Sequence, residues 1–304
     1  MVAWQNEIFV VAAAGNRGPA AMTIGVPGNV PYVMTVGAMT DNFTPDDGSD
    51  DELASFSSTG PTVEGFVKPE LVAPGGHMRG LVQGNSTLAG AYPEYYDGDY
   101  FEMSGTSQAT AVVSGVAALV LQAEPWRSVD ELKCKIMSAA KPATYRSKGK
   151  DNLAYSVFQQ GAGMVDAYAA VMNQMTGCAN NGLHIDNDID GFQHFGGPAN
   201  LQTDGTYHVR GNLDTKETGY VWNGSYAGSS GYLWTDGYLW TDGYLWTDAY
   251  LWTDGVGTNG YLWTDGYLWT DGYLWTDAYL WTDGYLWTDS LTEMASMSSW
   301  VEQE

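Results

Sequence analysis

The chain of 304 residues carries 36 acidic against 12 basic residues, a formal net charge of −24 at pH 7. A surface this acidic repels nucleic acid and anionic lipid, which excludes a nucleic-acid role and favours divalent cations or basic partners. The charge is uneven: residues 177–304 hold 18 of the acidic residues and only 2 of the basic ones, so more than one domain is expected, with a boundary near residue 176.

The first predicted element is a buried strand. Residues 8–13, I-F-V-V-A-A, form an apolar run, and a turn at Gly15 and Asn16 follows it. A second apolar strand is predicted near residues 32–38. Asn16 then lies beyond the carboxyl end of its strand, where functional side chains gather in parallel sheets. The alternative is that Asn16 is an ordinary turn residue.

Three helices are predicted further along the chain. They begin near Ser107, after a capping box formed by Ser128 and Glu131, and near Met164. Strands alternating with helices predict an α/β fold with a mostly parallel sheet covered on both faces, a three-layer α/β/α architecture. The predicted core face of the first helix consists of Val112, Val113, Val116, Leu119 and Val120. Cys134 is expected to be buried on the second helix, while a disulfide with Cys178 stays open.

Ser107 is the candidate nucleophile. It lies in S-G-T-S-Q-A-T-A, between a tight Gly-Thr turn and an Ala/Val-rich run, so its hydroxyl should be exposed at a helix N-terminus. A serine needs a base to take its proton, normally a histidine oriented by a carboxylate. His77 is predicted to be a solvated histidine of a Gly-rich loop and not that base. The alternative for Ser107 is an ordinary helix cap.

These motifs together resemble the subtilisin-like serine peptidases, the subtilases. The resemblance covers residues 1–175 and is carried by A-A-A-G-N at 12–16, L-A-S-F-S-S-T-G-P at 53–61, K-P-E-L-V-A-P-G at 68–75, G-T-S-Q-A-T at 105–110 and G-A-G-M-V-D-A at 161–167. It implies a serine endopeptidase that cleaves polypeptides through an acyl-enzyme. In that family pattern Ser107 is the nucleophile, Asn16 belongs to the oxyanion hole, and Ala13, Ala14 and Gly15 contribute to substrate binding.

The chain departs from the family pattern in one respect. Subtilases run Asp, His, Ser along the chain, yet only 15 residues precede Asn16 and all four histidines follow it. Residues 1–176 are therefore expected to be the C-terminal part of a peptidase domain, inactive without its N-terminal part. A split enzyme and a non-catalytic surface protein are the alternatives. The family also implies secretion, although no signal peptide is recognised, and no segment is expected to span a bilayer.

Residues 177–230 are predicted to form an acidic linker. Within it, D-N-D-I-D-G at 186–191 resembles the opening of a calcium loop, in which alternating side chains supply oxygen ligands. The carboxylate expected at the loop's last position is replaced by Gly197. A solvated acidic turn is therefore favoured, with calcium binding as the alternative.

The remaining chain is repetitive. Nine copies of the hexad [G/A]-Y-L-W-T-D fill residues 231–254 and 260–289, and a tail follows at 290–304. Strand-forming residues between Asp-Gly turns predict an all-β solenoid or meander. The Asp residues of the hexads are predicted to prevent the strands from aggregating, and calcium binding by these residues is the alternative. Regularly spaced Trp and Tyr suit sugar rings, a cell surface or self-association, and repeat expansion without a role is the alternative.

Overall fold

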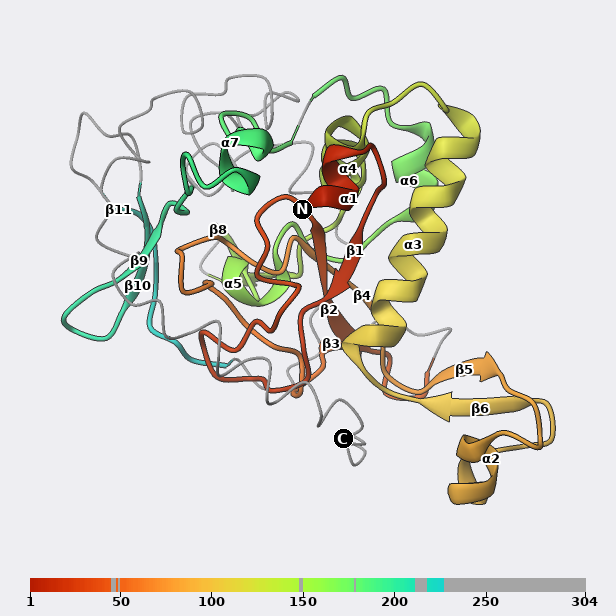
Figure 1. The fold of residues 1–304 in the computed structure, drawn as a ribbon. Helices are drawn as coiled ribbons and strands as arrows, with labels where there is room; N and C mark the ends of the chain where they lie inside the picture. The colour runs from red at the N-terminus through yellow and green to blue at the C-terminus, as the bar shows by residue number, and fades with distance from the viewer. Residues whose placement is uncertain (45–47, 49, 148–149, 178, 211–217, 227–304) are drawn as a thin grey trace.

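The computed structural model describes residues 1–44, 48, 50–147, 150–177, 179–210 and 218–226 (Figure 1). The hexad repeats at 231–289 and the tail at 290–304 lie outside these residues, as does Cys178. The predictions of a solenoid or meander, and of a disulfide with Cys178, therefore stay predictions.

The central sheet is built around β2 (Met34–Thr40), all of whose residues are buried. β1 (Val11–Ala13) runs parallel to β2 along one edge, and β4 (Leu71–Pro74) runs parallel to it along the other. β3 (Glu52–Leu53) pairs antiparallel with the end of β2. The two strands expected near residues 8–13 and 32–38 are confirmed, with bounds shifted by two or three residues.

One face of this sheet is covered by α3 (Thr106–Ala123), which contacts β1, β2 and β4 (Figure 1). α4 (Val129–Ala139) and α6 (Ala167–Met172) pack against α3 and against each other. The capping box at the start of α4 is confirmed, with the Ser128 side chain accepting from the Glu131 N–H and the Glu131 carboxylate accepting from the Ser128 N–H. The α/β class is thus confirmed, and Cys134 is fully buried on α4 as expected.

The predicted core face of α3 is partly wrong. Val113, Val116 and Val120 are buried, but Leu119 is 49% exposed. The residues that replace it in the core are small, Ala109 and Ala117. Because α3 carries no charged residue and its exposed side also includes alanine and glycine, the sequence pattern does not distinguish its inward face clearly. By length and composition α3 is the one helix among the described residues that could cross a membrane, so the expectation of no spanning segment is not confirmed.

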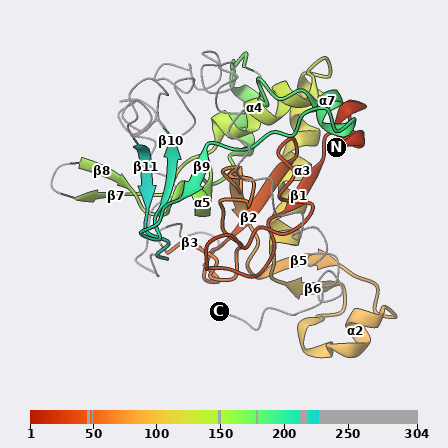
Figure 2. The same ribbon diagram turned by 60° about the vertical axis from the view of Figure 1, so that its left-hand side comes forward.

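The remaining elements surround this core. A hairpin of β5 and β6 projects from the body and carries two short helices (Figures 1 and 2). The bounds of these outer elements are α1 (Val2–Gln5), β5 (Met78–Leu81), α2 (Thr87–Ala91), η1 (Pro93–Tyr95), β6 (Tyr100–Met103), β7 (Thr144–Ser147), β8 (Lys150–Leu153) and α5 (Val157–Gln160).

The structure differs from the expected linker at 177–230. After α7 (Ile185–Ile189), the strands β9 (Ala199–Leu201), β10 (Tyr207–Arg210) and β11 (Thr218–Trp222) form an antiparallel sheet, seen beside α5 in Figure 2. Aromatic side chains of β10 and β11 pack on Phe158 of α5, and the Trp222 ring centroid lies 5.7 Å from that of Phe158. This burial of aromatic surface joins the sheet to the main core.

The suggested calcium loop is a short helix. Residues 186–189 belong to α7, and their carboxylates have separate protein partners. Asp186 accepts from Gln5, whereas Asp188 accepts from the Tyr32 hydroxyl at 3.1 Å and pairs with His194 at 2.9 Å. Within the described residues no group of three or more His, Cys, Asp or Glu side chains could hold a metal ion. The geometry of this segment therefore does not match the loop that calcium requires.

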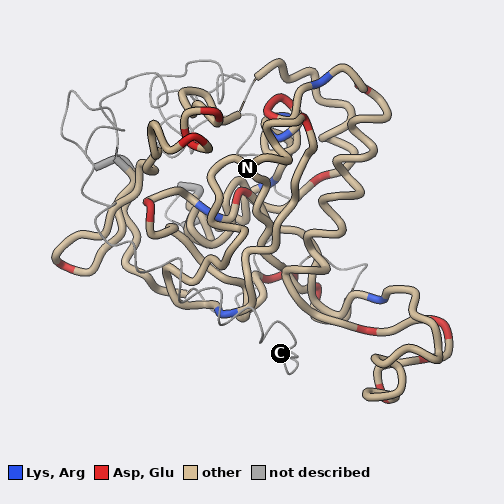
Figure 3. The backbone as a smooth tube through the Cα atoms, in the orientation of Figure 1, with Lys and Arg blue, Asp and Glu red and all other residues tan. Residues whose placement is uncertain are grey.

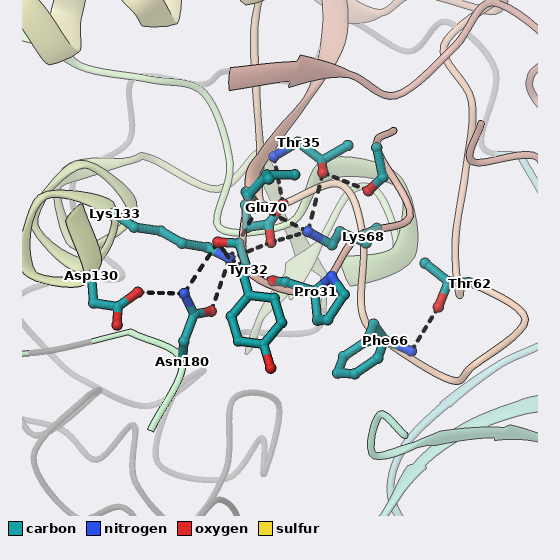
Figure 4. Close-up of polar contacts among 12 residues, drawn as sticks. Pro31, Tyr32, Thr35, Thr62, Phe66, Lys68, Glu70, Asp130, Lys133 and Asn180 are labelled. Atoms are coloured by element: carbon teal, nitrogen blue, oxygen red, sulfur yellow. Dashed lines mark hydrogen bonds and ion pairs between the residues drawn. The ribbon is translucent and has the colours of Figure 1, made fainter. Parts of the chain in front are cut away.

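A buried ionic cluster ties β2 and β4 to α4 (Figure 4). The Glu70 carboxylate lies between the ammonium groups of Lys68 and Lys133, and all three residues are at most 4% exposed. Lys133 also donates to backbone carbonyls that precede β2, while Lys68 donates to the Val33 carbonyl. Buried charges are tolerated only when paired and hydrogen-bonded, and this cluster meets both conditions.

Candidate active site

The two predicted site motifs meet where β1 ends and α3 begins. The Thr106 N–H and the Thr106 hydroxyl both donate to Asn16 Oδ1, each at 2.9 Å. The same hydroxyl accepts from the Gly15 N–H at 3.1 Å. Three hydrogen bonds therefore join segments that are about ninety residues apart in sequence, and they fix the Asn16 amide beside the residue that precedes Ser107.

The backbone that presents Asn16 depends on Gly15. Gly15 has φ +110°, a conformation that side chains disfavour, and a Cβ there would lie 2.8 Å from Ser58 Oγ. Ser58 is hydrogen-bonded to the residues on either side of Asn16. Its N–H donates to the Gly15 carbonyl at 2.9 Å, and its hydroxyl accepts from the Arg17 N–H at 3.1 Å. The close approach of Ser58 thus explains why a glycine precedes Asn16.

Ser107 is the second residue of α3 and its side chain is exposed. Two residues before it, the Gly105 N–H donates to the Gly75 carbonyl at 2.8 Å and so anchors the turn to the end of β4. A Cβ on Gly105 would lie 3.3 Å from Asn16 Nδ2, so the amide nitrogen approaches this turn closely. Since Asn16 Oδ1 is occupied by Thr106, the Nδ2 donor is the group left to face a ligand.

This arrangement can stabilise a developing negative charge. The Thr106 N–H donates to Asn16 Oδ1 and the Gln108 N–H donates to the Gly105 carbonyl at 3.1 Å, so among the described residues Asn16 Nδ2 and the Ser107 N–H are the donors left at the N-terminal end of this long helix, an end that favours an anion. Ser107 carries the hydroxyl beside them. A carbonyl carbon attacked by Ser107 would therefore place its oxygen near preorganised donors.

The histidines are engaged elsewhere. The prediction that His77 is a solvated loop residue is wrong: its ring stacks on Phe43 with centroids 3.5 Å apart, and both ring nitrogens are shielded without a hydrogen-bond partner in the described part of the chain. His184 precedes α7, His194 pairs with Asp188, and His208 contacts Thr206. Among the described residues, no hydrogen bond connects a histidine to Ser107.

Sequence reasoning missed the role of Thr106. The sequence pattern predicts only a turn at Gly105 and Thr106, whereas Thr106 is 1% exposed and links both motifs. The available signal was a hydroxyl residue at the first helical position, where orphan backbone groups need partners. Ala13 and Ala14 lead directly into this site: Ala14 is fully buried and its N–H donates to the Val36 carbonyl at 2.9 Å.

Comparisons with known proteins identify the family of this chain. The model of the subtilase family matches residues 1–163. Serine protease AprX of Bacillus subtilis (strain 168) is 43% identical over 173 residues, 57% of this chain and 37% of that protein. The halolysin-like extracellular serine protease Nep of Natrialba magadii is 32% identical over 163 residues, 54% of this chain and 23% of that protein.

Among solved structures, the Prenylagaramide maturation protease PagA is similar, with a TM-score of 0.41, 26% sequence identity, and coverage of 58% of this chain and 54% of that chain. The chain spans less than half the length of the curated relatives AprX and Nep.

Proposed function

The chain belongs to the subtilase family of serine peptidases, and on that premise we propose that it supplies the nucleophile and oxyanion half of an endopeptidase site. The observation that carries this proposal is the double hydrogen bond from Thr106 to Asn16 Oδ1, which occupies that oxygen and leaves the Asn16 Nδ2 donor close to Gly105, two residues before Ser107. Polypeptides are the expected substrates, since peptidases of this family act on them.

The proposed reaction begins when Ser107 Oγ attacks the carbonyl carbon of a peptide bond. The serine proton passes to a base, and the carbonyl oxygen becomes an oxyanion held by Asn16 Nδ2 and the Ser107 N–H. Collapse of this intermediate breaks the C–N bond, and the protonated base returns its proton to the departing amine. Water then hydrolyses the acyl-enzyme by the same steps, releasing the acid and restoring Ser107.

The base and its orienting carboxylate come from polypeptide outside residues 1–304, because the described histidines are engaged away from Ser107. The chain by itself is therefore expected to be inactive. In subtilisin, loss of the catalytic histidine alone lowers kcat by about 10⁶. We also infer that the protein is exported, supported by the extracellular relative Nep.

A mixing experiment tests this function. The full chain is combined with the part of AprX that lies on the N-terminal side of the matched segment, and hydrolysis of a quenched fluorescent protein substrate is followed. We expect turnover from the mixture, none after Ser107→Ala, and a loss of about 10²–10³ in kcat after Asn16→Ala. Ser86→Ala on the projecting hairpin is the matched control and should leave turnover unchanged.

Two results would contradict the proposal. Equal turnover from the Ser107→Ala mixture would remove Ser107 as the nucleophile. Turnover from the unmixed chain would show that the base does not come from another segment.

A further inference from the structure

The strand β11 contains a sequence similar to the hexad of the tail. Residues 219–224 read G-Y-V-W-N-G and the hexad reads G-Y-L-W-T-D, so Gly, Tyr and Trp stand at the same three positions and Val replaces Leu. In the structure the strand ends at Trp222, and a turn follows in which Gly224 has φ +79°. This hexad-like segment therefore folds as a short strand followed by a turn.

The two faces of β11 carry different side chains. Tyr220 and Trp222 face the core, and their ring centroids lie 6.2 and 5.7 Å from that of Phe158. Val221, which stands between them, is 49% exposed. Side chains alternate between the two faces of a strand. A hexad that folds in the same way places its Tyr and Trp on one face and its Leu on the other.

β11 is an edge strand. Among the described strands it pairs only with β10, and Figure 2 shows it at the outer side of the three-stranded sheet. Charged side chains commonly protect an exposed edge from pairing, but β11 has none, as Figure 3 shows. An uncharged edge of this kind is a template for a further strand.

The contact between β10 and β11 shows which side chains suit this edge. Tyr207 of β10 stands directly opposite Trp222, with ring centroids 5.5 Å apart. The first hexad of the tail can repeat this contact on the other edge of β11. Antiparallel pairing that sets Leu233 opposite Val221 keeps the Leu and Val side chains on one face. The same register sets Tyr232 opposite Trp222 and so forms a second Tyr–Trp pair.

We propose that the outer edge of β11 is the docking site of the first hexad, residues 231–236, which adds an antiparallel strand to the sheet. The path of the chain supports this occupant. The Tyr226 hydroxyl donates to the Leu53 carbonyl at 2.7 Å and holds the chain at the body, and only the small residues 227–230, A-G-S-S, separate Tyr226 from the hexad. The docked hexad offers the next copy, residues 237–242, an edge of the same sequence.

This docking makes the tail a continuation of the folded body. Antiparallel addition of successive hexads corresponds to the meander and not to the solenoid. The inference is independent of the proposed peptidase activity, because it concerns a sheet that follows the family match at residues 1–163.

The test joins the two strands by a disulfide in the full chain. Val221→Cys is combined with Leu233→Cys, and every variant also carries Cys178→Ser, while Cys134 is fully buried. Directly opposite residues of antiparallel strands have Cα atoms about 4.5–5.5 Å apart, a distance that a disulfide spans. After oxidation in dilute solution, the remaining thiols are labelled with a maleimide and counted by mass spectrometry.

Two cysteine pairs of the opposite geometry are the matched controls. They combine Val221→Cys with Tyr232→Cys or with Trp234→Cys, whose thiols face the other side of a docked strand. In a tail that does not dock, all three pairs oxidise at nearly equal rates, because one residue more or less hardly changes the entropy of loop closure. Concentrated urea supplies this reference. Without urea, the Leu233→Cys pair should oxidise at least about tenfold faster than either control, because a disulfide needs Cβ atoms that point toward each other.

Hydrogen exchange gives a second measurement on the unmodified chain. In an edge strand, alternate backbone N–H groups point away from the neighbouring strand and exchange with solvent. Docking of a hexad should slow exchange at Tyr220, Val221 and Trp222 alike. An open edge leaves at least one of these three amides fast.

Three results would each overturn the proposal. They are equal oxidation rates for the three cysteine pairs without urea, covalent dimers in place of intramolecular disulfides, and a fast amide among residues 220–222. Covalent dimers would identify a second copy of the chain as the occupant of the edge.

Discussion

Replacing Glu70 with glutamine should be among the most destabilising polar substitutions in the chain. Glu70 Oε1 accepts from Lys68 and lies 2.8 Å from Lys133 Nζ, whereas Oε2 accepts from the Thr35 N–H at 2.7 Å. In Glu70→Gln one of these oxygens becomes an NH₂ group. Either orientation of the amide then places a donor against another donor, so rotation of the side chain cannot relieve the conflict.

The expected magnitude follows from burial. Glu70 and both lysines are at most 4% exposed, so the lysine charges cannot turn to water when the carboxylate is lost. Removing one partner of a buried ion pair costs about 3–5 kcal/mol. A domain has a free energy of unfolding of about 5–15 kcal/mol, so the variant should lose a large part of its stability.

The assay is urea unfolding followed by far-UV circular dichroism. Tryptophan fluorescence is unsuitable because most of the 13 tryptophans lie in the hexad repeats. Glu94→Gln, at an exposed position in η1, is the matched control and should change the free energy of unfolding by less than about 0.5 kcal/mol. A loss below about 1 kcal/mol in Glu70→Gln would refute the conclusion that this carboxylate neutralises the two lysines.

Three further predictions concern the site and the cluster. Thr106→Val should lower the free energy of unfolding by about 1–3 kcal/mol, because the Gly15 N–H loses its acceptor. Thr106→Ser keeps the hydroxyl and is the control. An equal loss of stability in both variants would contradict this reason. Gly15→Ala should cost about 1–3 kcal/mol through its positive φ and the contact with Ser58, and an unchanged urea midpoint would disprove it. Burial lowers the pKa of Lys68 from 10.5 to about 7, although attraction by Glu70 opposes the effect. The unfolded chain then binds more protons between these values, so stability should rise with pH across this window, by at most about 1.4 kcal/mol per pH unit. Lys68→Met should reduce this dependence of the free energy of unfolding on pH. An unchanged dependence would show that other groups cause it.

The sequence predicted the features that depend on neighbouring residues. The strand before Asn16, the helix that begins near Ser107 and the capping box of Ser128 all follow from local patterns, and the structure contains each of them. The meeting of Asn16 with the start of α3 came from the family resemblance, because no local pattern encodes a contact across 90 residues.

The features that the sequence did not predict depend on distant partners. His77 stacks on Phe43, which lies on another loop, so the Gly-rich sequence around His77 does not predict that its ring is shielded from water. The strands of the expected linker are short, and their aromatic residues find Phe158 only in the folded chain. The exposed position of Leu119 was not predicted because α3 carries no charged residue to mark the side that faces away from the sheet.

The buried cluster and the candidate site are mechanically connected through two adjacent strands. Glu70 holds the Thr35 N–H, and Thr35 of β2 is paired with Ala12 of β1. Ala12 is four residues before Asn16, and the intervening Ala14 N–H donates to Val36, the residue after Thr35. Stability of the cluster therefore sets the position of the strand end that presents Asn16. The turn that presents Asn16 is therefore supported within this chain by the same sheet that the buried cluster holds.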